Sequence, residues 1–252
     1  MKKKNDILSK LKEFWHFIWH DDSLLSYVLN FALAFIFIKY IFFPGLGFAL
    51  QTDYPIVAIV SGSMEHKVVN GKVCYENYLE DRNLDFDSWY RYCGSYYEKN
   101  FGLNKSEFYD FEYRNGLNIG DVMVLRGKNP SKIEVGDILV FNPQDKVYGD
   151  LAQSLNMKDG SSFFMNAYGP VIHRVVDKWQ DDNGDWHFTT KGDHNAQTIS
   201  NHKRLNNQVS FTDFESDIPQ DDVIGVVAFR IPYLGYAKIV LNKIYLFVVG
   251  LV

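Results

Sequence analysis

Ser63 has the sequence setting of a nucleophile. It follows the apolar, β-branched run 56–60 directly, within Ser61-Gly62-Ser63-Met64-Glu65. A serine placed just after a strand and beside a glycine can be held exposed, with backbone N–H groups near its hydroxyl. Such a turn would supply a nucleophile and an oxyanion site together, although most Ser-Gly-Ser tripeptides are ordinary turns.

His173 and Asp193 could supply the base and the acid that such a serine requires. His173 lies in the apolar run 171–176, and a histidine that is neutral near pH 7 can remove a serine proton. Asp193 lies in the Thr-Lys-Gly-Asp-His-Asn segment 190–195, where its carboxylate would orient His173. The structural alternatives are a histidine buried in the core and an aspartate that caps a turn.

The elements that must position these residues are predicted to be strands. Short runs rich in Val, Ile and Phe occur at 56–60, 121–125, 137–141, 171–179, 186–190 and 223–230. Asn183-Gly184 favours a type I′ hairpin turn between the fourth and fifth runs. Because no helical stretch of 10–15 residues separates these strands, a parallel α/β sheet is disfavoured and a mainly β, antiparallel domain is expected over 50–232.

Residues 67–115 interrupt this pattern as an insertion rich in Tyr, Phe, Asp and Asn. The insertion holds both cysteines, Cys74 and Cys93. Outside the cell a disulfide between them would stabilise the segment by about 3 kcal/mol on the chain-entropy model, and two unpaired buried thiols are the alternative. We expect the aromatic side chains of the insertion to line a membrane-facing rim that receives substrate.

Leu24 to Phe43 is an almost unbroken apolar run. Twenty helical residues span roughly 30 Å, the thickness of the bilayer's hydrocarbon core, so a transmembrane helix is predicted at 23–45, with Pro44-Gly45 ending it. No Lys or Arg follows the run until Lys67, whereas five lysines precede it: Lys2, Lys3, Lys4, Lys10 and Lys12. This asymmetry predicts a cytoplasmic N-terminus. A cleaved signal peptide is disfavoured because the apolar run is too long.

Two further segments have membrane character. Residues 1–22 place Ile7, Leu11, Phe14 and Ile18 on one helical face, which favours a cytoplasmic amphipathic helix on the membrane surface or against another protein. The C-terminal segment 233–252 is apolar but is interrupted by Lys238, Asn242 and Lys243. A second membrane segment and an interfacial helix therefore both stay open.

The composition excludes or disfavours several other classes of protein. The chain has 252 residues, of which 46% are hydrophobic and 23% charged, so a wholly disordered chain is excluded. A net charge of −5 leaves no basic excess, so nucleic acid is not an expected partner. The spacings of the histidines at 187, 194 and 202 match no zinc signature, so no metal is expected.

Four motifs occur in the order found in type I signal peptidases, and the chain resembles that family over about 50–235, apart from the insertion. The motifs are Ser-Gly-Ser-Met-Glu, Gly-Asp-Ile-Leu-Val-Phe, Ile-His-Arg-Val-Val and Thr-Lys-Gly-Asp-x-Asn. His173-Arg174 stands where the common bacterial enzymes carry Lys-Arg, so the chain is similar to the archaeal and endoplasmic-reticulum branch, which uses Ser and His. The resemblance implies an antiparallel signal-peptidase-like β domain with an N-terminal transmembrane helix.

The resemblance also implies roles for residues. Ser63 would be the nucleophile and His173 the general base, and Ser61 and the backbone N–H of Ser63 would face the oxyanion. The acid stays open, because the family usually has a further Asp about six residues after Gly-Asp-x-Asn and 198–200 holds no acid here. Asp193, Asp213 or Asp217 would orient His173, or Ser63 and His173 would work as a dyad. His66 is a second departure, at a position where the family commonly has Pro.

We therefore expect a membrane-bound serine endopeptidase that removes signal peptides from exported preproteins, cleaving after small residues at the −1 and −3 positions. Its catalytic domain would lie on the extracytoplasmic side of the cell membrane, and no cofactor is implied. Expected partners are signal-peptide-bearing preproteins, membrane lipid and the secretion translocon. The alternative is a non-catalytic, membrane-anchored β binding module, in which Ser63 and His173 would lie far apart. A self-cleaving repressor-type protease is disfavoured, because those enzymes use Lys as the base and have no membrane span.

Overall fold

The computed structural model describes residues 2–74, 76–77, 80–142, 170–196, 215–237 and 240. The chain divides into two compact units, Met1–Asp53 and Tyr54–Val252. Most of the predicted C-terminal membrane segment, 233–252, lies outside the described residues.

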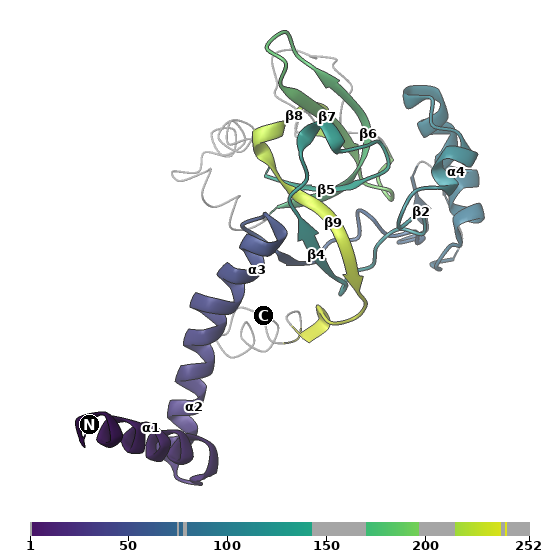
Figure 1. Ribbon diagram of the computed structural model, residues 1–252. Coiled ribbons are helices and arrows are strands. Elements are labelled where there is room, and N and C mark those ends of the chain that lie inside the picture. Colours follow the sequence, from purple (N-terminus) through teal and green to yellow (C-terminus); the bar gives the residue numbers. More distant parts are fainter. Residues whose placement is uncertain are drawn as a thin grey trace, which may run out of the picture. The chain divides into compact units, whose positions relative to one another are not determined.

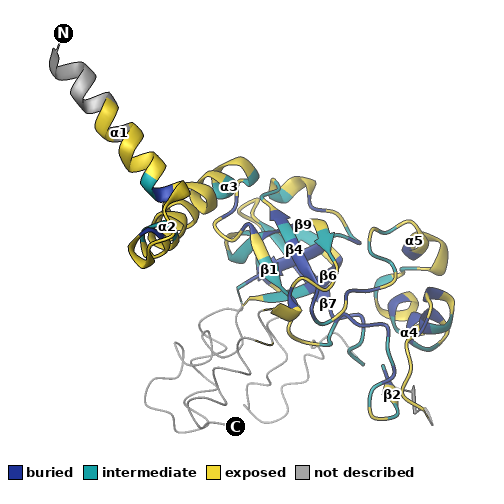
Figure 2. Cartoon of the chain, turned by 90° about the horizontal axis from the view of Figure 1, so that it is seen from below, coloured by how far each residue is buried: buried dark blue, intermediate teal, exposed yellow. Residues whose placement is uncertain are grey.

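The first unit consists of helices. These are α1 (Lys2–His20), α2 (Leu24–Phe37), the π-helical turn η1 (Ile38–Phe42) and α3 (Phe43–Leu50), which follow one another in Figure 1. Together α2, η1 and α3 form a helix of 27 residues, the one helix in the described part of the chain that is long and apolar enough to cross a membrane. Its apolar side chains are exposed, as expected for a surface that lipid would cover (Figure 2).

Two polar residues within this apolar helix join it to α1. The Ser26 hydroxyl donates to the Phe17 carbonyl oxygen at 2.9 Å, and the Asn30 side-chain amide donates to the Ile18 carbonyl oxygen at 2.5 Å. Both acceptors lie in the last turn of α1, where the Phe17 carbonyl also accepts from the Asp21 N–H at 3.3 Å. Ser26 and Asn30 therefore fix the corner between the two helices.

The structure corrects the predicted end of the apolar helix at Pro44-Gly45. The Phe43 N–H bonds to the Ile38 carbonyl oxygen, five residues earlier, so the π-helical turn shifts the hydrogen-bond register ahead of the proline. Pro44 then falls in the first turn of α3, where its missing N–H costs nothing. The helix continues to Leu50 and ends at Gln51, which has a left-handed φ of 55°.

A seven-stranded antiparallel sheet forms the centre of the second unit, which confirms the mainly β prediction (Figure 1). The strand order is β1-β4-β9-β5-β6-β7-β8. The bounds are β1 (Ile56–Ala58), β4 (Val122–Arg126), β5 (Ile138–Phe141), β6 (Val171–Gln180), β7 (Trp186–Lys191), β8 (Ile218–Pro219) and β9 (Val223–Ile231). Two single 3₁₀ turns, η2 (Pro130–Lys132) and η4 (Gln220–Asp222), precede β5 and β9.

β5 lies at the middle of the sheet and is buried along its whole length. Successive side chains of a strand point to opposite faces, and here each face carries its own apolar cluster. Ile138 and Val140 pack with Met64 and Met123, whereas Leu139 and Phe141 belong to a second cluster. A core on both faces explains why this run is apolar without alternation.

The insertion forms a small subdomain beside the sheet. It contains β2 (Lys72–Val73), β3 (Glu76–Asn77), α4 (Phe86–Phe101) and α5 (Lys105–Tyr109). Bridges from Glu65 to Gly116 and from Lys67 to Asn83 close its base. The helix α4 was not predicted, although its local signals are present in the sequence. Asp85 caps its first turn, Gly102 ends it at a φ of 69°, and apolar residues recur at helical spacing.

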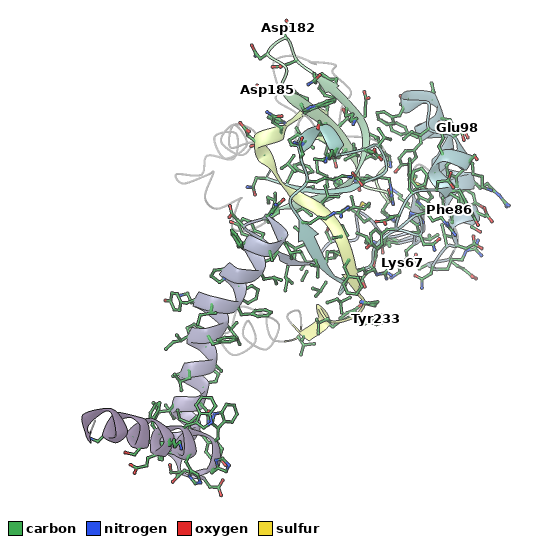
Figure 3. All side chains as sticks on the ribbon, viewed as in Figure 1. Lys67, Phe86, Glu98, Asp182, Asp185 and Tyr233 are labelled. Atoms are coloured by element: carbon green, nitrogen blue, oxygen red, sulfur yellow. A yellow bond between two sulfur atoms is a disulfide. The ribbon has the colours of Figure 1, made fainter. Side chains whose placement is uncertain are left out.

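Five aromatic side chains of the insertion are buried and cannot line a membrane-facing rim, whereas the Tyr109 side chain is 50% exposed. For the other aromatic residues of the insertion, the rim stays a prediction. Trp89, Tyr97 and Phe108 are fully buried, and Phe86 and Tyr90 nearly so. They pack on one another and, with Val176 of β6, form a third core cluster. Cys74 and Cys93 form a disulfide within this cluster, as the bonded alternative anticipated. Side chains fill the space between α4 and the sheet (Figure 3).

Candidate active site

Ser63 lies in a tight turn that follows β1. The Glu65 N–H bonds to the Gly62 carbonyl oxygen and closes this turn, while the fully buried Met64 side chain anchors it in the core. Ser63 is half-buried and Ser61 exposed, with 3.3 Å between their hydroxyl oxygens. The two predicted serines therefore lie together at the surface of the sheet, as a nucleophile and an oxyanion donor would.

His173 and Arg174 are consecutive residues of β6, paired with Leu139 and Ile138 of β5. Alternation along the strand sends their side chains to opposite faces of the sheet. Both side chains are buried, with exposures of 5% for His173 and 0% for Arg174. His173 contacts Glu215 and Arg174 contacts Asp193, and these two pairs differ in the reactions they can support.

Glu215 is the carboxylate that contacts His173. Its Oε1 atom contacts Nδ1 of His173, and the Glu215 side chain is fully buried. A carboxylate at Nδ1 fixes the tautomer that carries its proton there and leaves Nε2 as a proton acceptor. Glu215 was not among the predicted carboxylates, which were all aspartates, and its one signal in the sequence is an acid shortly before β8.

The other ring nitrogen of His173 faces the Ser63 turn across Gly192. A methyl group at Gly192 would lie 2.8 Å from His173 Nε2 and 2.8 Å from the Ser63 carbonyl oxygen. The His194 N–H also donates to that carbonyl at 2.8 Å. Ser63 and His173 thus share one neighbour, whereas the binding-module alternative places them far apart.

Asp193 is held by other residues than His173. Its carboxylate accepts hydrogen bonds from Arg174 Nη2 at 2.7 Å, Arg174 Nε at 3.0 Å, His66 Nε2 at 3.2 Å and the Tyr97 hydroxyl at 3.2 Å. Burial by itself would raise the pKa of Asp193, but the Arg174 guanidinium and the His66 hydrogen bond outweigh it and hold that pKa well below its usual range. Asp193 therefore carries a permanent charge that Arg174 neutralises.

The other two predicted carboxylates do not complete the site within the described residues. Asp217 Oδ1 lies 2.6 Å from Nδ1 of His187, in a partly exposed pair at the far end of β7. Asp213 lies outside the described residues. Among the carboxylates that the structure describes, Glu215 is the one in contact with His173 Nδ1, where an aspartate was predicted.

Lys191 and His66 add to the electrostatics around Asp193. Burial lowers the pKa of Lys191 to about 8, although the Asp193 and Glu215 carboxylates oppose that shift. Burial also lowers the pKa of His66, again against the effect of Asp193. The His66 ring stacks on Trp89 with 3.9 Å between ring centroids, so the residue that replaces the family's Pro joins the insertion to the site. Within the described residues, no group of three His, Cys, Asp or Glu could hold a metal ion.

The chain is similar in sequence to several known proteins. The signal peptidase complex catalytic subunit SEC11 of Tuber melanosporum is 28% identical over 222 residues, which cover 88% of this chain and 81% of the relative. The chain is homologous to SEC11 subunits. SEC11 of Schizosaccharomyces pombe is 25% identical over 215 residues, 85% of the chain and 81% of that protein. SEC11C of Homo sapiens is 25% identical over 123 residues, about half of each chain. No family model matches the chain.

This homology confirms the resemblance to the endoplasmic-reticulum branch of type I signal peptidases. The relatives carry the name of a catalytic subunit, which supports the peptidase prediction over the binding module. The matches to the two fungal proteins extend over most of the chain, so they reach beyond the short motifs.

Proposed function

We propose that this chain is a membrane-anchored serine endopeptidase that removes signal peptides from preproteins. One observation carries the proposal: His173 contacts the Glu215 carboxylate through Nδ1 and faces the Ser63 turn through Nε2. The names of the SEC11 relatives support the same activity.

In the proposed mechanism, the Ser63 hydroxyl attacks the scissile carbonyl carbon while His173 Nε2 accepts its proton. The Glu215 carboxylate stabilises the resulting imidazolium through Nδ1–H. The Ser61 hydroxyl and the Ser63 N–H donate to the developing oxyanion. His173 then protonates the leaving amine, and an acyl-enzyme forms on Ser63. Water, activated by the same Nε2, hydrolyses that ester and restores the serine.

The substrate would bind as an extended strand beside Ser63, with small residues at −1 and −3 in shallow pockets. The apolar helix Leu24–Leu50 would hold the enzyme at the membrane where signal peptides emerge. The lysines before it favour a cytoplasmic N-terminus and an extracytoplasmic catalytic domain. The relatives are named as subunits of a signal peptidase complex, so partner subunits of the same kind are proposed in addition to preproteins, lipid and the translocon.

The test is cleavage of a signal-peptide-bearing preprotein by the full chain in detergent with added lipid. The wild type is expected to release the mature protein with a single new N-terminus after the signal peptide, while Ser63→Ala and His173→Ala release none above background. Cleavage that survives Ser63→Ala would contradict the assigned nucleophile. Absence of cleavage by the wild type, with a related peptidase active in the same assay, would contradict the proposal for the isolated chain.

A further inference from the structure

The insertion contacts the turn that separates Ser63 from His173. The indole N–H of Trp89 donates to the Asp193 carbonyl oxygen at 3.2 Å, and Cys74 Sγ lies 3.5 Å from the same oxygen. The Tyr97 hydroxyl donates to the Asp193 carboxylate at 3.2 Å. Three residues of the insertion thus hold one residue of the 192–195 turn, next to the glycine that touches His173.

Tyr97 links the two residues on either side of Gly192. Its hydroxyl oxygen accepts a hydrogen bond from Lys191 Nζ at 3.2 Å while its proton goes to Asp193. Lys191 Nζ also donates to the Gly192 carbonyl at 2.9 Å and the Asn195 carbonyl at 2.7 Å. Lys191, Asp193 and Tyr97 are all fully buried, so water cannot replace these bonds.

The disulfide fastens this arrangement. Cys93 lies on α4 between Trp89 and Tyr97, one helical turn from each, and its bond to Cys74 joins the helix to a residue in contact with Asp193. The disulfide therefore keeps α4, which carries the two side-chain donors, beside Cys74, which lies against the turn.

We propose that Tyr97, held by the Cys74–Cys93 disulfide, is a positioning residue that sets the Gly192 turn, and through it the alignment of His173 with Ser63. This inference rests on the proposed peptidase function and extends it. It gives Tyr97 and the disulfide a positioning role in the reaction and makes cleavage sensitive to thiol reductants.

The pH profile would report this role separately from folding. The Lys191 ammonium is faced by Tyr96 and Tyr97 of α4, Asp193 of the turn, Arg174 of β6, and Glu215. The Tyr97 hydroxyl is one of its three acceptors, so its removal disfavours the charged form further. The charged form of Lys191 holds the Gly192 and Asn195 carbonyls of the turn, so its loss at high pH should lower activity. Because burial already lowers the pKa of Lys191 to about 8, Tyr97→Phe is expected to move the alkaline limb of the activity profile to lower pH.

The experiment compares Tyr97→Phe with Tyr90→Phe in the full chain, using preprotein cleavage. Tyr90 lies on the same helix, but its hydroxyl donates to Glu98 and Leu103, away from the turn. Tyr97→Phe is expected to lower kcat about tenfold, leave KM within about twofold and move the alkaline limb to lower pH. Tyr90→Phe is expected to match the wild type. Equal kcat and equal pH profiles for the two variants would overturn the inference.

Reduction of the disulfide is the second measurement and needs no substitution at Tyr97. Dithiothreitol is expected to lower wild-type kcat about as much as Tyr97→Phe does, and reoxidation to restore it. The Cys74→Ala/Cys93→Ala variant is expected to have that lowered rate without responding to dithiothreitol. An unchanged wild-type rate after complete reduction would overturn the inference.

Ser63→Ala separates this inference from the function on which it rests. A wild-type rate equal to that of Ser63→Ala would overturn the proposed function, and the positioning role with it. A Ser63-dependent rate that neither Tyr97→Phe nor reduction lowers would overturn the positioning role alone.

Discussion

Two buried carboxylates flank neighbouring residues of β6, and only one of them leaves its partner able to react. Glu215 contacts one nitrogen of His173, and the other nitrogen faces Gly192 and the Ser63 turn. Asp193 contacts Arg174, which has no nitrogen left over. Both carboxylates are fully buried, so burial alone does not distinguish a reactive pair from a structural one.

All three guanidinium nitrogen atoms of Arg174 donate hydrogen bonds. Its Nε and Nη2 atoms bond to Asp193, while Nη1 donates to the Glu112 and Gly136 carbonyls and Nη2 also to the Tyr113 carbonyl. These hydrogen bonds join β6 to the end of the insertion, at Glu112 and Tyr113, and to the turn before β5, at Gly136. The guanidinium does not lose its charge near pH 7. The difference between the two pairs predicts different consequences for their substitution.

The largest expected effect on stability is that of Arg174→Met. Removing one partner of a buried ion pair leaves Asp193 uncompensated and is expected to cost about 3–5 kcal/mol in the free energy of unfolding. Urea denaturation measures this loss. Arg126→Met, at an exposed position of β4, is the control and should change the free energy of unfolding by less than about 0.5 kcal/mol. A loss below about 1 kcal/mol for Arg174→Met would contradict the structural role.

Gly192→Ala should damage the reactive pair more than the structural one. The added methyl group would lie 2.8 Å from His173 Nε2 and from the Ser63 carbonyl, so one of them must shift. A small misplacement of reacting groups is expected to lower kcat about 10- to 100-fold. Gly45→Ala, where a methyl group meets no atom within 4 Å, is the control for preprotein cleavage. Wild-type kcat for Gly192→Ala would contradict the proposed contact.

Lowering the pH should destabilise the buried group of Asp193, Arg174 and His66 through protonation of His66. Burial holds the pKa of His66 below its usual 6.5, so the unfolded chain binds its proton at a higher pH than the folded one does. The free energy of unfolding should therefore fall as the pH drops below 6.5, by at most about 1.4 kcal/mol per pH unit for one proton. His66→Gln is expected to flatten this part of the stability profile, measured by urea denaturation between pH 7 and 5. If the free energy of unfolding of His66→Gln depends on pH as steeply as that of the wild type, a group other than His66 causes the loss of stability in acid.

The smallest effect is expected for Asp217→Asn. Asp217 pairs with His187 at a partly exposed site, so its loss should cost under about 1 kcal/mol in the free energy of unfolding. Preprotein cleavage should stay at the wild-type rate, because this pair is separate from His173. A large loss of cleavage would mean that Asp217, rather than Glu215, supports the base.

The strands and the motif residues could be predicted because their signals are local. The expected strands 121–125 and 171–179 match β4 and β6 to within a residue, since β-branched runs follow Gly-Asp or precede Asn-Gly turns. The four motifs also located Ser63 and His173, which the sheet brings to a shared neighbour.

The acid and the insertion could not be predicted in the same way. Glu215 lies 22 residues beyond Asp193, and its place beside His173 depends on how the chain returns to β8, which sequence spacing does not encode. Asp193 was one candidate to orient His173, but alternation along β6 puts Arg174 on the opposite face, where Arg174 binds that carboxylate. The burial of Trp89 and Tyr97 follows from α4, a helix within a segment whose Asp, Asn and Tyr content is typical of loops.

The most direct test of the account compares Glu215→Gln with Asp193→Asn. Both substitutions neutralise a buried carboxylate without changing its size, and both kcat for preprotein cleavage and the free energy of unfolding would be measured for each. Glu215→Gln is predicted to lower kcat per folded molecule by roughly 10²- to 10⁴-fold, with a smaller loss of stability than Asp193→Asn. Wild-type kcat for Glu215→Gln, together with a much lower kcat for Asp193→Asn, would contradict the assignment of Glu215 as the partner of the catalytic base.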